Sequence, residues 1–384
     1  MERLKVLLFI SAEADAVDIH HELTTQLAHY MGEYADVRLM TAHDKEGTDL
    51  TGCHLLHIFG SWSHSASHLM LKAHRQHVPT VYTPLGGLQP WVLRHHKPSR
   101  LFAYQRRMTA LASAVHVCGK LEGDTFAKLG WNKRVALIKN PVLTSQLTFD
   151  DMTGQMLALY RKVLDSNARL LLSADSCAVI GQLLALSIDK DILRDRERCT
   201  ALRQRLSLLT EDDWRRVFIY SADEQIERNL LEGLSRIQFA APHTVTADIV
   251  RFAPAKRYNE GTLKDDDTYS RNILMRNKLD EAIASKEQHE RRLIVQLLNL
   301  RHELEHHKAP LLHLADIYQT VRFTDMDEDR LKEIVCDLGI DDFAARLMAV
   351  MHEVMGLTEG FMPFAAKEGR ATRRLVGDIT KYNT

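Results

Sequence analysis

Two segments of the sequence each end an apolar run at glycine and then continue with polar or aromatic side chains. The first is His57–Ser63 (HIFGSWS) and the second is Val81–Trp91 (VYTPLGGLQPW). Glycine lets the backbone turn sharply and approach a ligand closely, as a parallel α/β sheet requires where its strands leave the carboxyl edge. Trp62 and Trp91 supply flat apolar faces on which the ring of a ligand could pack. The two segments therefore predict a ligand crevice at a sheet edge.

The candidate binding residues are the small, polar and aromatic residues at these expected strand ends, with an arginine from the helix expected at 100–112. They are Gly60, Ser61, Trp62, Gly86, Gly87, Trp91, Arg106 and Asn140. Arg107 is an alternative to Arg106. The catalytic residues are not identified by any motif, and His57 is the nearest imidazole that could act as a general base. Its position in the strand also allows its side chain to face the core, and both tryptophans could instead pack under loops.

Strand and helix signals alternate through residues 1–145, and this alternation would position the crevice. Strands are expected at 5–10, 37–41, 55–59, 80–83, 114–117 and 134–138, and helices at 19–31, 65–77, 100–112 and 121–129. Alternating strands and helices imply parallel pairing, right-handed crossovers and helices on both sheet faces. The predicted fold class is α/β, with a Rossmann-like parallel-sheet lobe at the N-terminus and a mostly helical C-terminal region.

The remainder of the chain is predicted to be helical and to form three segments. These are a mostly helical middle domain at 146–240, a linker at 241–268 and a helical C-terminal domain at 269–384. Within them we expect a lone strand at 217–220, one helix at 223–237, a long charged helix at 271–307, and a helix capped by Thr324 or Asp325. The apolar segment 170–188 predicts a buried helix, because Asp175 would be costly inside a bilayer.

The order of the pieces in the first lobe resembles the N-terminal lobe of family-4-type glycosyltransferases of the two-lobed fold. In that family a strand ends in H-x-H-G-x-W-S and a second ends in S/T-P-H-G-x-L-x-P-W. An arginine-rich helix, a strand with an acidic helix and a P-N-G-V-like turn follow. The matching pieces here are His57–Ser63, Thr83–Trp91, the helix with Arg100, Arg106 and Arg107, Ala114–Glu122 and Val135–Val142. The resemblance implies nucleotide-sugar-dependent glycosyl transfer to a carbohydrate acceptor.

Three departures from the family pattern leave two functions open. Leu85 stands where the family has histidine, and the Ile10–Asp15 loop contains no glycine. Glu224 and Glu232 have the family's E-x7-E spacing, but no glycine-rich loop surrounds them. The chain is therefore either a transferase with a degenerate or replaced donor lobe, or a non-catalytic scaffold or regulator. In the second case residues 270–384 would bind a protein partner or a second copy of the chain.

One further motif suggests a different chemistry. The residues from His302 to His306 spell H-E-L-E-H, and two histidines four apart on a helix can share a zinc ion. Glu305 places a charge inside this motif, and no third ligand has a recognisable position. We therefore predict no metal site and no cofactor.

Composition restricts the remaining classes of function. The chain has 384 residues, of which 45% are hydrophobic and 26% are charged, and its formal net charge is −1. A near-neutral chain has no overall attraction for nucleic acid, so no nucleic-acid partner is expected. Five scattered cysteines without a C-x-x-C pair indicate reduced thiols. With no secretory cleavage site after Met1 and no membrane span, we expect a cytoplasmic protein.

Overall fold

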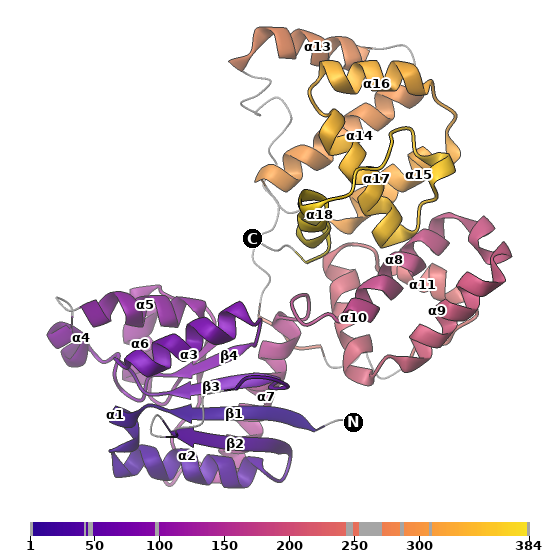
Figure 1. Cartoon of the computed structure of the whole chain (residues 1–384). Coiled ribbons are helices and arrows are strands. Elements are labelled where there is room, and N and C mark those ends of the chain that lie inside the picture. The colour runs from indigo at the N-terminus through magenta and orange to yellow at the C-terminus, as the bar shows by residue number, and fades with distance from the viewer. Residues whose placement is uncertain are drawn as a thin grey trace. The chain divides into compact units, whose positions relative to one another are not determined.

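The computed structural model describes residues 3–41, 44, 49–96, 100–242, 249–252, 271–284, 288–306 and 309–381 (Figure 1). Contacts divide the chain into two compact units. The first unit comprises Met1–Asn167 and Ile249–Ala253, and the second comprises Ala168–Asp248 and Pro254–Thr384. Most of the expected linker at 241–268 lies outside the described residues.

The described residues of the first unit form a six-stranded parallel sheet, in the order β2-β1-β3-β4-β5-β6. The strands are β1 (Leu4–Ile10), β2 (Ala35–Thr41), β3 (Leu55–Phe59), β4 (Thr80–Thr83), β5 (Ala114–Val117) and β6 (Val135–Leu137). This sheet, followed by a mostly helical region, confirms the predicted α/β fold class. The order reverses between β1 and β3, and ligands of open α/β sheets bind outside the carboxyl ends near such a point.

Helices cover both faces of this sheet, because alternate strand residues point to opposite sides. On one face, Leu8 of β1 shares a core with helices α2 (Asp18–Met31) and α7 (Phe149–Ser166). On the other face, Phe9 shares a core with helices α3 (His64–Arg75), α5 (Arg100–Leu111) and α6 (Lys120–Leu129). The short helices α1 (Ala12–Asp15) and α4 (Pro90–His96) follow β1 and β4. Figure 1 shows α3, α5 and α6 on one side of the strands and α2 on the other.

The described residues of the second unit are helical and share one apolar core. The helices are α8 (Ala174–Ile188), α9 (Arg196–Leu208), α10 (Glu211–Asp223), α11 (Glu227–Arg236), α13 (Ile273–Ala284), α14 (Gln288–His306), α15 (Leu311–Phe323), α16 (Glu328–Asp337), α17 (Asp341–Met355) and α18 (Arg370–Lys381), with 3-10 turns at Lys190–Arg194 and Glu359–Phe361. Glycine permits two of these helices to approach closely. A Cβ atom at Gly233 of α11 would overlap the backbone of Leu183 on α8.

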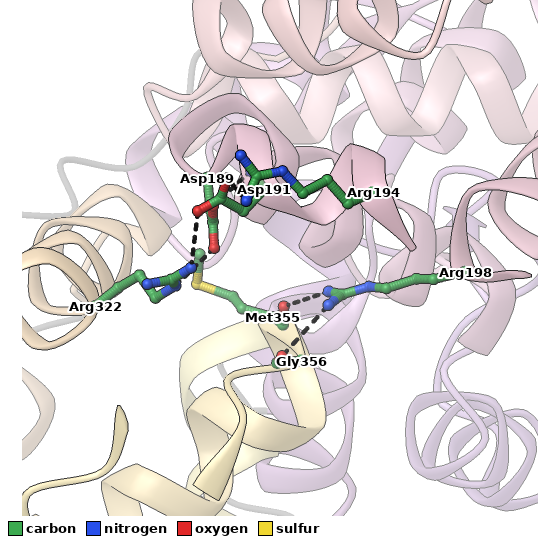
Figure 2. Close-up of polar contacts among 7 residues, drawn as sticks. All are labelled: Asp189, Asp191, Arg194, Arg198, Arg322, Met355 and Gly356. Atoms are coloured by element: carbon green, nitrogen blue, oxygen red, sulfur yellow. Dashed lines mark hydrogen bonds and ion pairs between the residues drawn. The ribbon is translucent and has the colours of Figure 1, made fainter. Parts of the chain in front are cut away.

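Two arginines bind helix ends together in the second unit (Figure 2). Arg322 donates to the buried Asp189 at 2.7 Å and to Asp191 at 3.3 Å. Arg198 donates to the carbonyls of Met355 at 3.0 Å and of Gly356 at 3.5 Å, where α17 ends. A cation at a helix C-terminus satisfies unpaired carbonyls and stabilises the helix dipole. The segment that follows α8 is thereby held to the last turn of α15, and α9 is held to the end of α17.

Several local predictions in the helical region were wrong. Residues 217–220 belong to helix α10, which begins with a capping box between Thr210 and Asp213, and they are not a strand. The helix expected at 223–237 is interrupted at Gln225, whose φ of 61° ends α10 before α11 begins. The capping residue of α16 is Asp327, because its carboxylate accepts from the amides of Asp329 and Arg330.

The expected long helix at 271–307 contains α13 and α14, with residues 285–287 between them outside the described part. The apolar segment 170–188 contains α8, whose side chains contribute to the second core, as expected of a buried helix. None of the described helices has the length and apolar character needed to span a bilayer.

Candidate functional site

The segments that carry the ordered sequence motifs lie at successive carboxyl ends of the sheet. Gly60–Ser63 follows β3, Pro84–Gln89 follows β4, Glu122 lies in the first turn of the helix after β5, and Asn140 follows β6. Strands β3 to β6 are neighbours and run parallel, so these ends meet at one edge. The structure therefore gathers residues that are up to eighty positions apart in the sequence along a single edge, as their order predicts.

The glycines at this edge make room for the protein's own side chains. Gly60 has a φ of 102°, and a Cβ there would overlap Ser11 Oγ. A Cβ at Gly87 would overlap the side chain of Ser61. Leu85 and Gly86 have φ values of 53° and 83°, so the chain turns through the left-handed region there. Close packing within the fold thus accounts for the glycines at positions 60 and 87.

Trp62 is fixed by contacts within the protein. Its indole Nε1 donates to the carbonyl of Gly87 at 2.8 Å, and its backbone amide donates to Gln105 Oε1 at 2.9 Å. The His96 ring stacks on the indole with a centroid separation of 4.2 Å and an interplanar angle of 10°. Trp91, in contrast, is 54% exposed. Of the two tryptophans, Trp91 offers the more accessible surface to a ligand, while Trp62 joins two edge loops.

His57 lies fully buried inside the core of the first unit. Its Nδ1 is 2.6 Å from the Tyr160 hydroxyl, and its Nε2 is 2.7 Å from Thr83 Oγ1. Thr83 Oγ1 is also 2.8 Å from Nδ1 of His116, whose Nε2 is 3.0 Å from the carbonyl oxygen of Ile138. This buried hydrogen-bond chain, Tyr160–His57–Thr83–His116–Ile138, crosses strands β3, β4 and β5.

The direction of every bond in this chain follows from the Ile138 carbonyl, which can only accept. Nε2 of His116 must then donate, so its Nδ1 accepts from Thr83, which in turn accepts from Nε2 of His57. Nδ1 of His57 accepts from Tyr160. Every polar atom of both rings is thus paired while both imidazoles are neutral. Burial and the neighbouring His116 lower the pKa of His57 well below its usual value, and burial lowers the pKa of His116 to about 4.

The other predicted site residues have separate environments. Asn140 is buried, and its Oδ1 accepts from the Val142 amide at 2.9 Å, which shapes the turn around Pro141. Ser61 is half-buried against Gly87. Arg106 is exposed on α5, and no ion pair joins it to another described residue. The structure brings Ser61, Trp62 and Gly87 into contact.

Glu122 is the ionisable residue of this edge that the candidate set omitted. It is 2% exposed in the first turn of α6, and its Oε1 accepts from the backbone amide of Leu88 at 3.3 Å. Burial raises the pKa of this carboxyl to about 7, while backbone hydrogen bonds from Leu88 and Gly86 oppose the rise. A carboxyl with a pKa near neutrality can exchange a proton under physiological conditions, and such groups concentrate at functional sites.

The motifs of the second unit do not form a common site. Glu224 is buried and pairs with Arg169, whereas Glu232 pairs with Arg236 on the surface of the next helix. In the H-E-x-x-H segment, Glu303 Oε2 accepts from His313 Nδ1 at 2.6 Å, and the side chain of His306 is outside the described part. The structure shows no cluster of three or more metal-ligating side chains within its described ranges.

Comparisons with known proteins identify no relative, so the proposed function depends on the geometry described above. No protein-family model, curated protein or solved structure matches the chain.

Proposed function

We propose that this chain is a glycosyltransferase-related protein and that a nucleotide-sugar or carbohydrate binds at the carboxyl edge of its parallel sheet. Three features support the proposal. The motifs occur in the order typical of the family, they occupy successive carboxyl ends of neighbouring strands, and ligands of open α/β sheets bind outside those ends. Fold alone does not define an activity, so the proposal depends on the side chains at the edge.

The observation that carries the proposal is the contact between Glu122 and the turn at Gly86–Leu88. This turn belongs to one of the segments that resemble the family, and Glu122 lies against it with a pKa of about 7. A sugar hydroxyl that replaced the Leu88 amide as the partner of Glu122 would bring the carboxyl into contact with the ligand. Glu122 would then accept or donate the proton that a transfer or hydrolysis step requires.

His57 does not have this role in the proposed site. Both of its ring nitrogens are already hydrogen-bonded inside the core, to Tyr160 and Thr83. A general base needs a free lone pair within hydrogen-bonding distance of the substrate. We assign His57 to the core of the fold and Glu122 to the ligand.

A second candidate function is that of a non-catalytic scaffold or regulator. The observation that favours it is the second unit, whose described residues are helical and contain no strand of a second α/β lobe. In two-lobed transferases that lobe holds most of the nucleotide-sugar. A scaffold would keep the fold of the first lobe and use the helical unit to bind a protein.

The test is a thermal-shift and calorimetric screen of the full-length protein against nucleotide-sugars, monosaccharides and oligosaccharides. A ligand that binds only the folded state raises the melting temperature by mass action. We expect at least one nucleotide-sugar or carbohydrate to do so, and Glu122→Gln to weaken its binding. Asp124→Asn, which changes an exposed acid on the same helix, is the matched control.

Turnover separates the two candidates. Release of free nucleotide from the bound nucleotide-sugar, with loss of that release in Glu122→Gln, supports a transferase. Binding without release, together with a protein that co-purifies with the second unit, supports a scaffold. If no sugar-containing compound stabilises the wild-type protein, the proposed function is wrong.

A further inference from the structure

We propose that a groove along α3 of the first unit binds a phosphorylated nucleoside. The groove has a volume of about 650 Å³ and lies between one flank of α3 and the ends of β1 and β2. The inference rests on the proposed function, because it assigns the nucleotide part of a nucleotide-sugar to the first unit.

The described residues between β2 and β3 place no helix beside α3. Strands β1, β3, β4 and β5 are each followed by helix, but none of the described residues between β2 and β3 (44 and 49–54) is helical. In a doubly wound fold a crossover helix usually packs against the sheet at this place. Phe9 of β1 and Thr41 of β2 line the groove there.

The flank of α3 that lines the groove is basic. Ser65, His68, Lys72 and Arg75 follow one another at intervals of three or four residues, so they share one face of the helix. Lys72 carries an ammonium group and Arg75 a guanidinium group. Ammonium and guanidinium groups make charge-assisted hydrogen bonds to phosphate oxygens, and the guanidinium can bind two oxygens at once. This face therefore suits a phosphate or diphosphate group.

The other walls suit a nucleoside. Leu71 is half-buried and offers an apolar side chain against which a base can pack, while Phe9 and Leu69, which are 4% and 5% exposed, lie beneath it in the lining of the groove. Asp44 adds a carboxylate to the groove lining. This side chain is held at the end of β2, because its Oδ2 accepts from the Thr41 amide at 2.6 Å. An ionised carboxylate has further acceptor sites, and an acid after the second strand binds ribose hydroxyls in many nucleotide-binding folds. One anion-binding face, an apolar surface and one acceptor together match a nucleoside phosphate better than free phosphate.

The first experiment is calorimetric titration of the full-length protein with uridine, adenosine and guanosine diphosphates, with inorganic pyrophosphate, and with the unphosphorylated nucleosides. We expect at least one diphosphate to bind more tightly than pyrophosphate and its own nucleoside, and its affinity to fall as salt is raised. Lys72→Ala and Arg75→Ala should each weaken binding by about tenfold or more, since each removes a charged hydrogen bond. Lys128→Ala, an exposed lysine of α6 outside the groove, should leave the affinity unchanged.

A second variant tests the ribose contact. We expect the wild-type protein to bind a ribonucleoside diphosphate more tightly than its 2′-deoxy form. Asp44→Ala should abolish this preference, while the affinity for the diphosphate still falls as salt is raised. Failure of the wild-type protein to bind any diphosphate, or equal binding by wild type and the Lys72 and Arg75 variants, would overturn the groove assignment.

The outcome also separates the groove from the proposed function. Diphosphate binding that depends on Lys72 and Arg75, in a protein that binds no nucleotide-sugar or carbohydrate, confirms the groove and refutes the glycosyltransferase-related function. Sugar binding that depends on Glu122, in a protein whose diphosphate binding is unchanged by Lys72→Ala and Arg75→Ala, supports the proposed function and refutes the groove assignment.

Discussion

The hydroxyl of Tyr160 on α7 donates a hydrogen bond to Nδ1 of His57 on β3, at 2.6 Å. Both side chains are fully buried, so this bond joins a helix to the centre of the sheet without any water-exposed polar atom. This hydrogen bond gives His57 a structural role. From the sequence alone, its position beside a glycine-containing segment makes it a candidate general base. The bond also sets the direction of the hydrogen-bond chain that continues to Ile138.

Removing that hydroxyl should destabilise the first unit. Tyr160→Phe keeps the ring but leaves Nδ1 of His57 buried and unpaired, which costs about 1–3 kcal/mol of unfolding free energy. Chemical denaturation followed by tryptophan fluorescence measures the loss. Tyr34→Phe is the control, because Tyr34 is 55% exposed and should change stability little. Equal stability of the two variants would show that the buried bond contributes nothing.

The two buried histidines should make the folded state sensitive to acid. Their pKa values are lowered in the folded protein, to about 4 for His116, whereas an unfolded chain binds a proton near pH 6.5. The unfolded state therefore binds more protons below pH 6.5. Their contribution to stability is complete above that pH and is lost as the pH falls from 6.5 toward 4, by up to about 1.4 kcal/mol per pH unit for each histidine. Urea denaturation between pH 4 and 8 measures this slope. A double variant, His57→Asn with His116→Asn, should flatten it.

Glu122 should produce a slope of the opposite sign. Its folded pKa of about 7 is above the unfolded value of about 4.3, so the folded state binds more protons between these values. Its contribution is complete below pH 4.3 and is lost as the pH rises toward 7. Glu122→Gln keeps an oxygen for the Leu88 amide and removes the cost of a buried charge. We expect this variant to be more stable than wild type at pH 8, by up to about 3 kcal/mol, and to lose stability more steeply in acid. A variant that is less stable at pH 8 would contradict the raised pKa.

The two glutamates with E-x7-E spacing should differ in their importance for stability. Glu224 pairs with the buried Arg169 and also accepts from the Leu311 amide at 2.6 Å. Glu224→Ala leaves a guanidinium without its counter-charge in the core, which costs about 3–5 kcal/mol. Glu232→Ala removes a half-exposed pair with Arg236 and should cost less than about 1 kcal/mol. Thermal and chemical denaturation of both variants give the comparison. Similar effects of the two changes would support a shared role for this pair.

The sheet was predictable from sequence because its strands are short apolar runs bounded by glycine, proline or polar residues. Residues 55–59, 80–83 and 114–117 were predicted with the bounds that the structure shows. Residues 217–220 (VFIY) have the β-branched and aromatic composition of a strand, yet Tyr220 is part of a helix. There the capping box at Thr210 and packing in the second core outweigh local propensity.

The chemistry of the edge was less predictable, because it depends on contacts that are distant in sequence. All five residues of β3 are buried, so no alternation of polar and apolar side chains indicates which way His57 points. The raised pKa of Glu122 comes from its burial in the folded chain, and the Leu88 amide whose hydrogen bond opposes the rise lies 34 residues earlier in the sequence. An acid in the first turn of a helix after a strand is a common capping arrangement, so the sequence alone does not mark it as a ligand-binding residue.

The role of Gly87 can be tested by a compensating substitution. A Cβ at this position would overlap Ser61 and lie 3.0 Å from the Pro84 carbonyl, so Gly87→Ala should destabilise the protein by about 1–3 kcal/mol through overpacking. Adding Ser61→Gly removes the overlapping side chain and should restore part of the loss, which a double-mutant cycle quantifies. Gly119→Ala is the control, because a Cβ there meets no atom within 4 Å. Recovery in the double variant would show that Gly87 is required for packing against Ser61. If Gly87→Ala keeps full stability but loses ligand binding, the glycine instead serves the close approach of a ligand.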